Sequence, residues 1–283
     1  MENMYLLMKN ITLNYGKKEV LSNININLGC GIYGLLGENG AGKTSLLKIL
    51  CGLMSPTGGS ILYNGSEIGK MGITYRVNIG YLPQVTPYYP DFSVVDYLLY
   101  FATIKGISNG KEQVERLLNE AGLDSVQNCK MKNLSEGMKR KAAILQSLLG
   151  EPPILIFDEP TAGLDPNERN KFKRMINRYC DNRIIIISTH LVSDLEQLAD
   201  RIIVLSKGQV IKQGEKTNLL TELYGKVWES KLPIEMIHKI KPEDKIMYKD
   251  KEYFTVKTIL NEKPYDNSEK AVPDLEDLYS YYF

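Results

Sequence analysis

The sequence predicts an α/β fold: a parallel sheet core with helices, an antiparallel β subdomain, a helical insert and a small C-terminal α+β extension. Residues 32–54 and about 150–215 alternate apolar strands with helical stretches, as doubly wound proteins do. Residues 154–157 and 184–187 are continuous apolar runs, which are typical of strands buried on both faces of a parallel sheet. A chain of 283 residues is long enough for this core and for more than one subdomain.

Two further segments depart from the parallel pattern. Residues 4–29 and 59–64 have the features of antiparallel strands joined through hairpins. Residues 91–150 are helical in character, because a serine precedes an apolar periodic run at residues 93–100 and apolar side chains recur at helical spacing in residues 111–121. We expect this helical subdomain to move relative to the core.

The last part of the chain has a pattern of its own. Residues 226–229 and 253–256 alternate like short strands, and residues 233–240 and 273–279 have helical features, the latter with acidic residues in the first turn. Its aromatic residues are Trp228, Tyr253, Phe254, Tyr279, Tyr281, Tyr282 and Phe283. Because disordered tails are poor in aromatic residues, we predict a folded extension over residues 216–283.

A phosphate-binding loop follows the first strand of the predicted core. Residues 37–44 fit the pattern G-x-x-x-x-G-K-[ST], with an apolar strand before them and a helical run after them. Glycines let backbone N–H groups turn around phosphate oxygens, Lys43 supplies a positive charge for the β- and γ-phosphates, and Thr44 supplies a hydroxyl ligand for Mg²⁺. The predicted nucleotide contacts of this loop are Asn39, Gly40, Ala41, Gly42, Lys43, Thr44 and Ser45. The chain is therefore predicted to be a P-loop NTPase.

Two carboxylates follow the apolar run at residues 154–157. Asp158 stands at the end of this predicted strand and can hold Mg²⁺, and Glu159 beside it can polarise the attacking water. The alternative is that both residues only terminate a strand. Their position directly after a buried strand, in a chain that already has a phosphate-binding loop, favours the catalytic interpretation.

Together these residues resemble the ATP-binding cassette (ABC) family over roughly residues 4–215, and the resemblance implies a RecA-like core. It also implies roles for three isolated residues. Tyr15 lies where the family has an aromatic ring stacked on adenine, and a flat ring suits that contact. Gln84 corresponds to the Q-loop glutamine, which serves the Mg²⁺ site and the contact with the transport partner. His190 corresponds to the switch histidine that reaches the γ-phosphate.

The resemblance extends to two motifs that lie away from the phosphate-binding loop in sequence. Residues 134–138 occupy the place of the signature motif, whose serine hydroxyl and second glycine approach the γ-phosphate bound by the opposite protomer. Ser135 and Gly137 retain both groups, whereas Glu136 replaces a glycine. Asp165 matches the D-loop aspartate. The resemblance thus implies that Ser135, Gly137 and Asp165 also contact nucleotide.

One phosphate-binding loop and one signature motif imply a dimer that closes two composite ATP sites, formed with a second copy or a related chain. No apolar run reaches the roughly 20 residues needed to span a bilayer, so the transport pathway is expected in a separate permease. This places the chain at the cytoplasmic face of the membrane. Residues 226–229 and 275–278 resemble exporter-type cassettes of the ABC-2 group. We expect the aromatic residues of the extension to pack on the nucleotide-binding domain, residues 1–215, or on a second protomer, in a dimerisation or regulatory role.

Composition and the missing motifs narrow the function further. A net charge of +1 provides no argument for a nucleic-acid surface. The four cysteines contain no C-x-x-C pair and indicate neither a zinc site nor a disulfide framework. An importer cassette and a nucleotide-binding regulatory subunit with little turnover remain the alternatives to an exporter ATPase.

Overall fold

The computed structural model describes residues 4–241 and 244–283, which form two compact units. The first unit ends at Gln213, and the second comprises Gly214–Phe283. In the first unit a six-stranded sheet has the order β10-β9-β3-β8-β7-β6. Its strands are β3 (Gly31–Leu36), β6 (Ile79–Leu82), β7 (Ile154–Asp158), β8 (Ile184–Ser188), β9 (Arg201–Ser206) and β10 (Gln209–Glu215).

The central part of this sheet is parallel, because β3 pairs in parallel with β8 and β9, and β7 pairs in parallel with β8 and β6. Every residue of β7 and β8 is buried. The predicted parallel core is therefore confirmed, and its continuous apolar runs are explained by burial on both faces.

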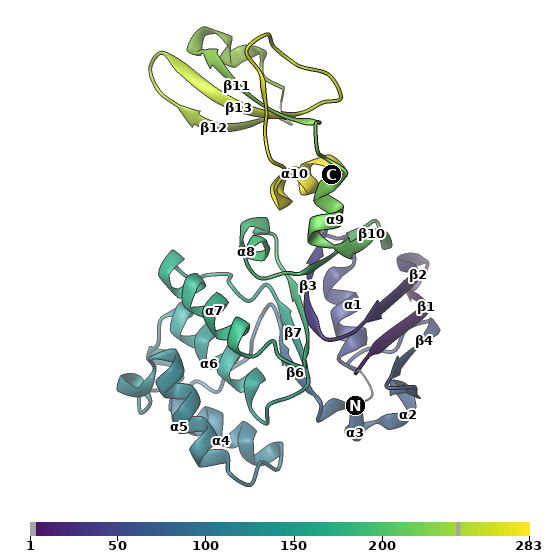
Figure 1. Cartoon of the computed structure of the whole chain (residues 1–283). Coiled ribbons are helices and arrows are strands. Elements are labelled where there is room, and N and C mark those ends of the chain that lie inside the picture. Colours follow the sequence, from purple (N-terminus) through teal and green to yellow (C-terminus); the bar gives the residue numbers. More distant parts are fainter. Residues whose placement is uncertain (1–3, 242–243) are drawn as a thin grey trace. The chain divides into compact units, whose positions relative to one another are not determined.

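The predicted antiparallel subdomain is also present. A four-stranded sheet of order β2-β1-β4-β5 contains β1 (Leu6–Tyr15), β2 (Lys18–Leu28), β4 (Gly58–Tyr63) and β5 (Ser66–Glu67). Helix α1 (Lys43–Leu50) lies between the two sheets (Figure 1), and one hydrophobic cluster joins side chains of both sheets with those of α1. Two short helices follow the antiparallel sheet, α2 (Ile68–Met71) and α3 (Ile73–Arg76).

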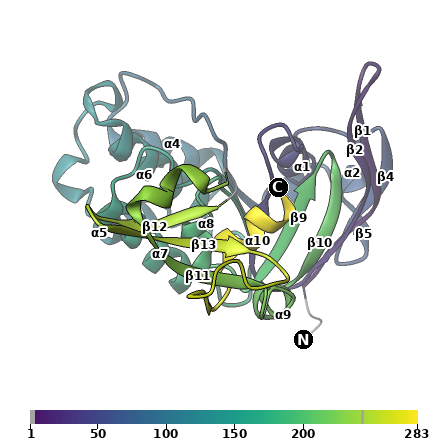
Figure 2. The ribbon, with the colours of Figure 1, turned by 90° about the horizontal axis from the view of Figure 1, so that it is seen from above.

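The helical insert lies at the opposite end of this unit from the antiparallel sheet, as both views show (Figures 1 and 2). Ser93 caps its first helix by accepting a hydrogen bond from the Asp96 N–H, at 3.1 Å. The insert consists of α4 (Val94–Ile104), α5 (Gly110–Ala121), η1 (Asp124–Val126), η2 (Met131–Asn133) and α6 (Glu136–Leu148). Two later helices complete the unit, α7 (Pro166–Arg178) and α8 (Val192–Glu196).

The second unit contains an antiparallel sheet of order β12-β13-β11-β14 and a C-terminal helix. Its elements are α9 (Lys216–Thr221), β11 (Val227–Pro233), η3 (Ile234–Lys239), β12 (Lys245–Lys249), β13 (Tyr253–Ile259), β14 (Glu269–Lys270) and α10 (Leu275–Tyr282). Phe254, Val256 and Leu232 form its core. The expectation that the aromatic residues of the extension pack on residues 1–215 or on a second protomer is wrong for Phe254, which is fully buried in the core of this unit.

The described residues include no helix with both the length and the apolar character that a membrane crossing requires.

Candidate nucleotide site

A cavity of 330 Å³ in the first unit brings together most of the predicted site residues. It lies where the loops after β3, β6 and β7 meet the hairpin between β1 and β2. This position is expected in an open α/β sheet, because ligands bind beyond the carboxyl ends of parallel strands. The lining residues are Tyr15, Lys18, Val20, Glu38, Asn39, Gly40, Gly42, Lys43, Thr44, Ser45, Gln84, Asp158 and Glu159.

Three of these lining residues were not predicted from the sequence: Lys18, Val20 and Glu38. Glu38 occupies a variable position of the phosphate-binding loop. Lys18 and Val20 follow Tyr15 on the neighbouring strand. The only available signal was their closeness in sequence to Tyr15 and to the loop. Contact with the cavity depends on how β2 packs, which no local motif encodes.

The phosphate-binding loop requires glycine where it enters α1. Gly42 has a φ of 105°, and a Cβ there would lie 2.7 Å from Leu21 Cδ2 and 3.0 Å from the Val20 carbonyl oxygen. A larger residue would therefore displace β2 from the loop. Ala41 differs from its neighbours, since its methyl belongs to the hydrophobic core and the residue is not among those lining the cavity.

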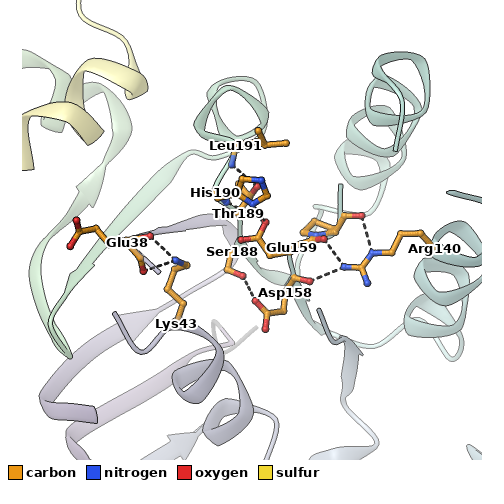
Figure 3. Close-up of polar contacts among 11 residues, drawn as sticks. Glu38, Lys43, Arg140, Asp158, Glu159, Ser188, Thr189, His190 and Leu191 are labelled. Atoms are coloured by element: carbon orange, nitrogen blue, oxygen red, sulfur yellow. Dashed lines mark hydrogen bonds and ion pairs between the residues drawn. The ribbon is translucent and has the colours of Figure 1, made fainter. Parts of the chain in front are cut away.

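Lys43 extends from the first turn of α1 across the loop (Figure 3). Its Nζ donates hydrogen bonds to the carbonyl oxygens of Gly37, at 2.6 Å, and Glu38, at 3.0 Å. Burial lowers the pKa of Lys43, and the charges of Glu159 and Asp158 oppose that shift. The loop therefore presents a buried cation that faces two carboxylates across the cavity.

Asp158 ends β7 with one carboxylate oxygen satisfied and the other unpaired. Oδ1 accepts a hydrogen bond from Ser188 Oγ at 2.5 Å, which fixes the side chain against the end of β8 (Figure 3). Oδ2 is buried and has no hydrogen-bond partner among the described residues. A buried carboxylate oxygen without a donor suits a bound cation. No group of three or more His, Cys, Asp or Glu side chains within the described ranges could hold a metal by itself. A cation here would therefore need oxygens from other groups.

Glu159 and His190 form one unit beside this carboxylate. His190 Nδ1 lies 2.6 Å from Glu159 Oε2, and the His190 N–H donates to the same oxygen at 3.2 Å. Glu159 is buried, whereas more than half of the His190 side chain is exposed. Glu159 also has a φ of 53°, an uncommon value for a residue other than glycine. The structure thus brings the predicted histidine against the predicted general base. Glu159 lines the cavity, whereas His190 is not among its lining residues.

Ser135, Gly137 and Asp165 are absent from the residues that line the cavity. Ser135 caps α6 by accepting from the Met138 N–H at 3.2 Å, and Asp165 caps α7 by accepting from the Glu168 N–H at 2.9 Å. Glu136 is mostly exposed, and its carboxylate lies 2.8 Å from Lys139 Nζ. Within one chain, these three residues lie at the starts of α6 and α7 and outside the lining of the nucleotide cavity.

Comparison with known proteins agrees with this arrangement. Residues 21–162 match the ABC transporter family. The Nod factor export ATP-binding protein I of Cupriavidus metallidurans is 34% identical over 224 residues, which cover 78% of this chain and 74% of that protein. The lantibiotic transport ATP-binding protein SrtF of Streptococcus pyogenes is 36% identical over 223 residues, or 77% of this chain and 95% of that protein.

Solved structures lead to the same family. The ATP-binding subunit of an ABC transporter superposes with a TM-score of 0.72 at 29% identity, covering 77% of this chain and 92% of that one. A bacterial Atm1-family ABC exporter with ATP bound superposes with a TM-score of 0.70 at 25% identity, covering 78% of this chain and 40% of that one. The chain therefore belongs to the ABC transporter family, as an ATP-binding subunit with the ATPase fold.

Proposed function

We propose that this chain hydrolyses ATP to drive export through a separate permease at the cytoplasmic face of a membrane. The observation that carries the proposal is the cavity that combines a complete phosphate-binding loop with Asp158 and Glu159. Two similar proteins are named for the export of Nod factors and the transport of lantibiotics. Their names support an exporter, and the chemical class of the substrate is left open.

The phosphate-binding half of the cavity supports binding of Mg-ATP. Lys43 is placed to exchange its two loop carbonyls for β- and γ-phosphate oxygens. Thr44, Gln84 and the unpaired Oδ2 of Asp158 would hold Mg²⁺ together with those phosphates. This donor set fits the ion, because Mg²⁺ in nucleotide sites takes one or two carboxylates and keeps several waters. When bound, Mg²⁺ would neutralise charge on the phosphates.

Hydrolysis is assigned to Glu159, with His190 holding its carboxylate. A carboxylate near the γ-phosphate can accept a proton from water, and the contact with His190 Nδ1 orients the oxygen that does so. Tyr15 is half exposed at the rim of the cavity, where its ring is available to stack on adenine.

The signature residues support pairing of two cassettes. Ser135, Gly137 and Asp165 do not line the cavity of their own chain, so we assign them to the nucleotide bound by a second protomer. Gln84 also lines a second cavity, of 380 Å³, together with Val85 and Tyr88. Val85 is 81% exposed. We assign this surface, which combines apolar side chains with the charged Glu136 and Lys139, to the permease contact.

Substitution of Glu159 tests the catalytic assignment. Glu159→Gln should keep ATP bound but lower turnover by roughly 10²–10⁴-fold, the usual contribution of a general base. The variant should also trap a closed dimer with ATP. Phosphate release by the assembled transporter measures turnover, and light scattering measures the dimer. Full ATPase activity of Glu159→Gln would refute the assignment.

A further inference from the structure

Arg140 connects three segments of the first unit through backbone contacts. It lies on α6, in the second turn after Ser135, and the residue is only 8% exposed. Its guanidinium donates six hydrogen bonds, five of them to backbone carbonyl oxygens. This is an unusual use of a buried arginine, because buried cations are normally paired with carboxylates.

One side of the guanidinium holds the turn that follows β6. Nη1 donates to the carbonyl oxygens of Pro83, at 2.9 Å, and Gln84, at 3.1 Å, and to Thr86 Oγ1 at 3.4 Å. The planar group reaches these acceptors from α6, so the backbone that carries Gln84 is tied to the signature helix. A lysine could not do the same while also reaching β7, because its donors are on one atom.

The other side holds the turn that follows β7 (Figure 3). Nη2 donates to the carbonyl oxygens of Asp158, at 2.8 Å, and Glu159, at 2.6 Å, and Nε donates to that of Pro160 at 3.2 Å. These are consecutive residues around the catalytic carboxylate. Burial lowers the pKa of Arg140, and the charges of Asp158 and Glu159 oppose that shift.

The turn that Arg140 holds is strained at Glu159. A residue other than glycine in the left-handed region costs of the order of 1–3 kcal/mol and persists only where surrounding contacts impose it. Glu159 has a φ of 53°, and besides Arg140 its backbone is held by the hydrogen bonds Glu159 N–H to Ser188 O, at 3.0 Å, and Ala162 N–H to Glu159 O, at 3.2 Å. Arg140 is thus one of the few groups that impose this conformation.

We propose that Arg140 is a positioning residue for ATP hydrolysis, which aligns the Glu159 carboxylate and the Gln84 turn with each other and with the signature helix. Arg140 is not among the residues that line the nucleotide cavity, so it acts on the reaction through Glu159. This proposal rests on the proposed role of Glu159. It predicts that loss of Arg140 slows turnover while ATP binding stays intact.

The test compares Arg140→Met and Arg140→Lys in the full-length protein. Arg140→Met removes all six hydrogen bonds with an unbranched apolar side chain and should lower kcat by about 10–100-fold, the effect of a catalytic group displaced by about 1 Å. The Kd for a fluorescent ATP analogue should stay within about twofold of the unsubstituted protein, because the phosphate contacts are made by other residues. Arg140→Lys should recover only part of kcat.

Arg183 provides a matched control. It also donates to a backbone carbonyl, that of Tyr179 at 2.9 Å, but it precedes β8 at the opposite end of the sheet. Arg183→Met should leave kcat unchanged. A double-mutant cycle combines Arg140→Met with Glu159→Gln. In that background Arg140→Met should lower kcat little further, because the carboxylate that Arg140 positions is already absent.

The outcomes distinguish failure of the positioning role of Arg140 from failure of the catalytic role of Glu159. Unchanged kcat in a folded Arg140→Met variant, or equal and additive losses in both backgrounds, would overturn the positioning role. If Arg140→Met does not fold, the Arg140→Lys variant decides, and full activity in that variant would overturn the role as well. Full activity in Glu159→Gln alone would instead refute the proposed catalytic assignment.

Discussion

The two units of this chain use buried charge for opposite purposes. In the first unit, Lys43, Asp158 and Glu159 are buried around a cavity, and Asp158 Oδ2 has no partner within the part of the chain that the structure describes. In the second unit, Lys257 is buried but fully engaged: its Nζ lies 2.8 Å from Asp274 and 2.6 Å from Asp277. The first arrangement leaves capacity for a ligand, whereas the second holds a helix.

The six-stranded sheet of the first unit and the antiparallel sheet of the second unit also differ in how they are buried. The strands of the parallel sheet are buried on both faces, so their polar groups appear only where the strands end. The antiparallel sheet of the second unit has one apolar core around Phe254 and an exposed edge strand, β12. Helix α10 is held by its buried Leu275 and Leu278, by its capping box at Asp274 and by the ion pairs with Lys257. Buried charged side chains therefore form a ligand site in the first unit, whereas in the second unit they form ion pairs that hold α10.

Lys257→Met tests this contrast with the largest expected effect. Removing one partner of a buried ion pair leaves Asp277 uncompensated and costs about 3–5 kcal/mol. The second unit should unfold at lower denaturant concentration, while ATP binding by the first unit is unchanged. Fluorescence of Trp228, the single tryptophan of the chain, reports on the second unit. The control is Lys249→Met, at an exposed position. If both variants unfold at the same denaturant concentration, the ion pairs of Lys257 have no structural role.

Lys43→Ala is the corresponding change in the first unit, and it should impair binding instead of folding. A hydrogen bond to a charged group contributes about 1.5–3 kcal/mol, so the affinity for ATP should fall at least roughly tenfold. The control is Lys48→Ala, on the exposed side of the last turn of the same helix. Isothermal titration with ATP measures the affinity. Wild-type affinity in Lys43→Ala would mean that the cavity is not the phosphate site.

Tyr15→Ala separates stacking from phosphate binding within the same cavity. Stacking of an aromatic ring on a base contributes about 1–3 kcal/mol, so KM for ATP should rise more than kcat falls. Tyr15→Phe keeps the ring and loses only the hydroxyl contact to Met54 Sδ, at 3.3 Å, and it should behave like the unsubstituted protein. An unchanged KM with a collapsed kcat would make Tyr15 a structural residue.

The smallest effect on nucleotide binding is expected from removal of residues 216–283, which make up nearly all of the second unit. A chain that ends at Glu215 keeps all strands of the six-stranded sheet and every residue that lines the cavity. It should bind Mg-ATP normally but show altered dimerisation or altered coupling to the permease. Identical light scattering and transport-coupled ATPase rates with and without residues 216–283 would remove the proposed accessory role. Loss of ATP binding would show that the units are not independent.

Local sequence patterns predict much of the secondary structure and of the nucleotide site in the first unit. The glycine-rich loop with Lys43 and Thr44, between an apolar strand and a helical run, predicts a phosphate site, because the backbone N–H groups and the helix start provide the chemistry. Apolar runs such as residues 184–187 likewise predict buried parallel strands, and the carboxylates directly after residues 154–157 predict the far side of the site. In the second unit, periodicity and an acidic first turn predicted the segments that form β11, η3, β13 and α10, whereas α9, β12 and β14 were not predicted.

Only the tertiary structure decided which distant residues meet. The cavity is also lined by Lys18, Val20 and Glu38, because β2 packs beside the phosphate-binding loop. No sequence motif predicts that contact. In the sequence, nothing distinguishes Arg140 from the other basic residues of its helix. In the structure it donates hydrogen bonds to backbone carbonyl oxygens up to 57 residues away in the chain. Phe254 finds its core partners inside the second unit, contrary to the sequence expectation. Local patterns specify backbone geometry and residue chemistry, whereas packing between segments far apart in the chain specifies which side chains share one low-dielectric space.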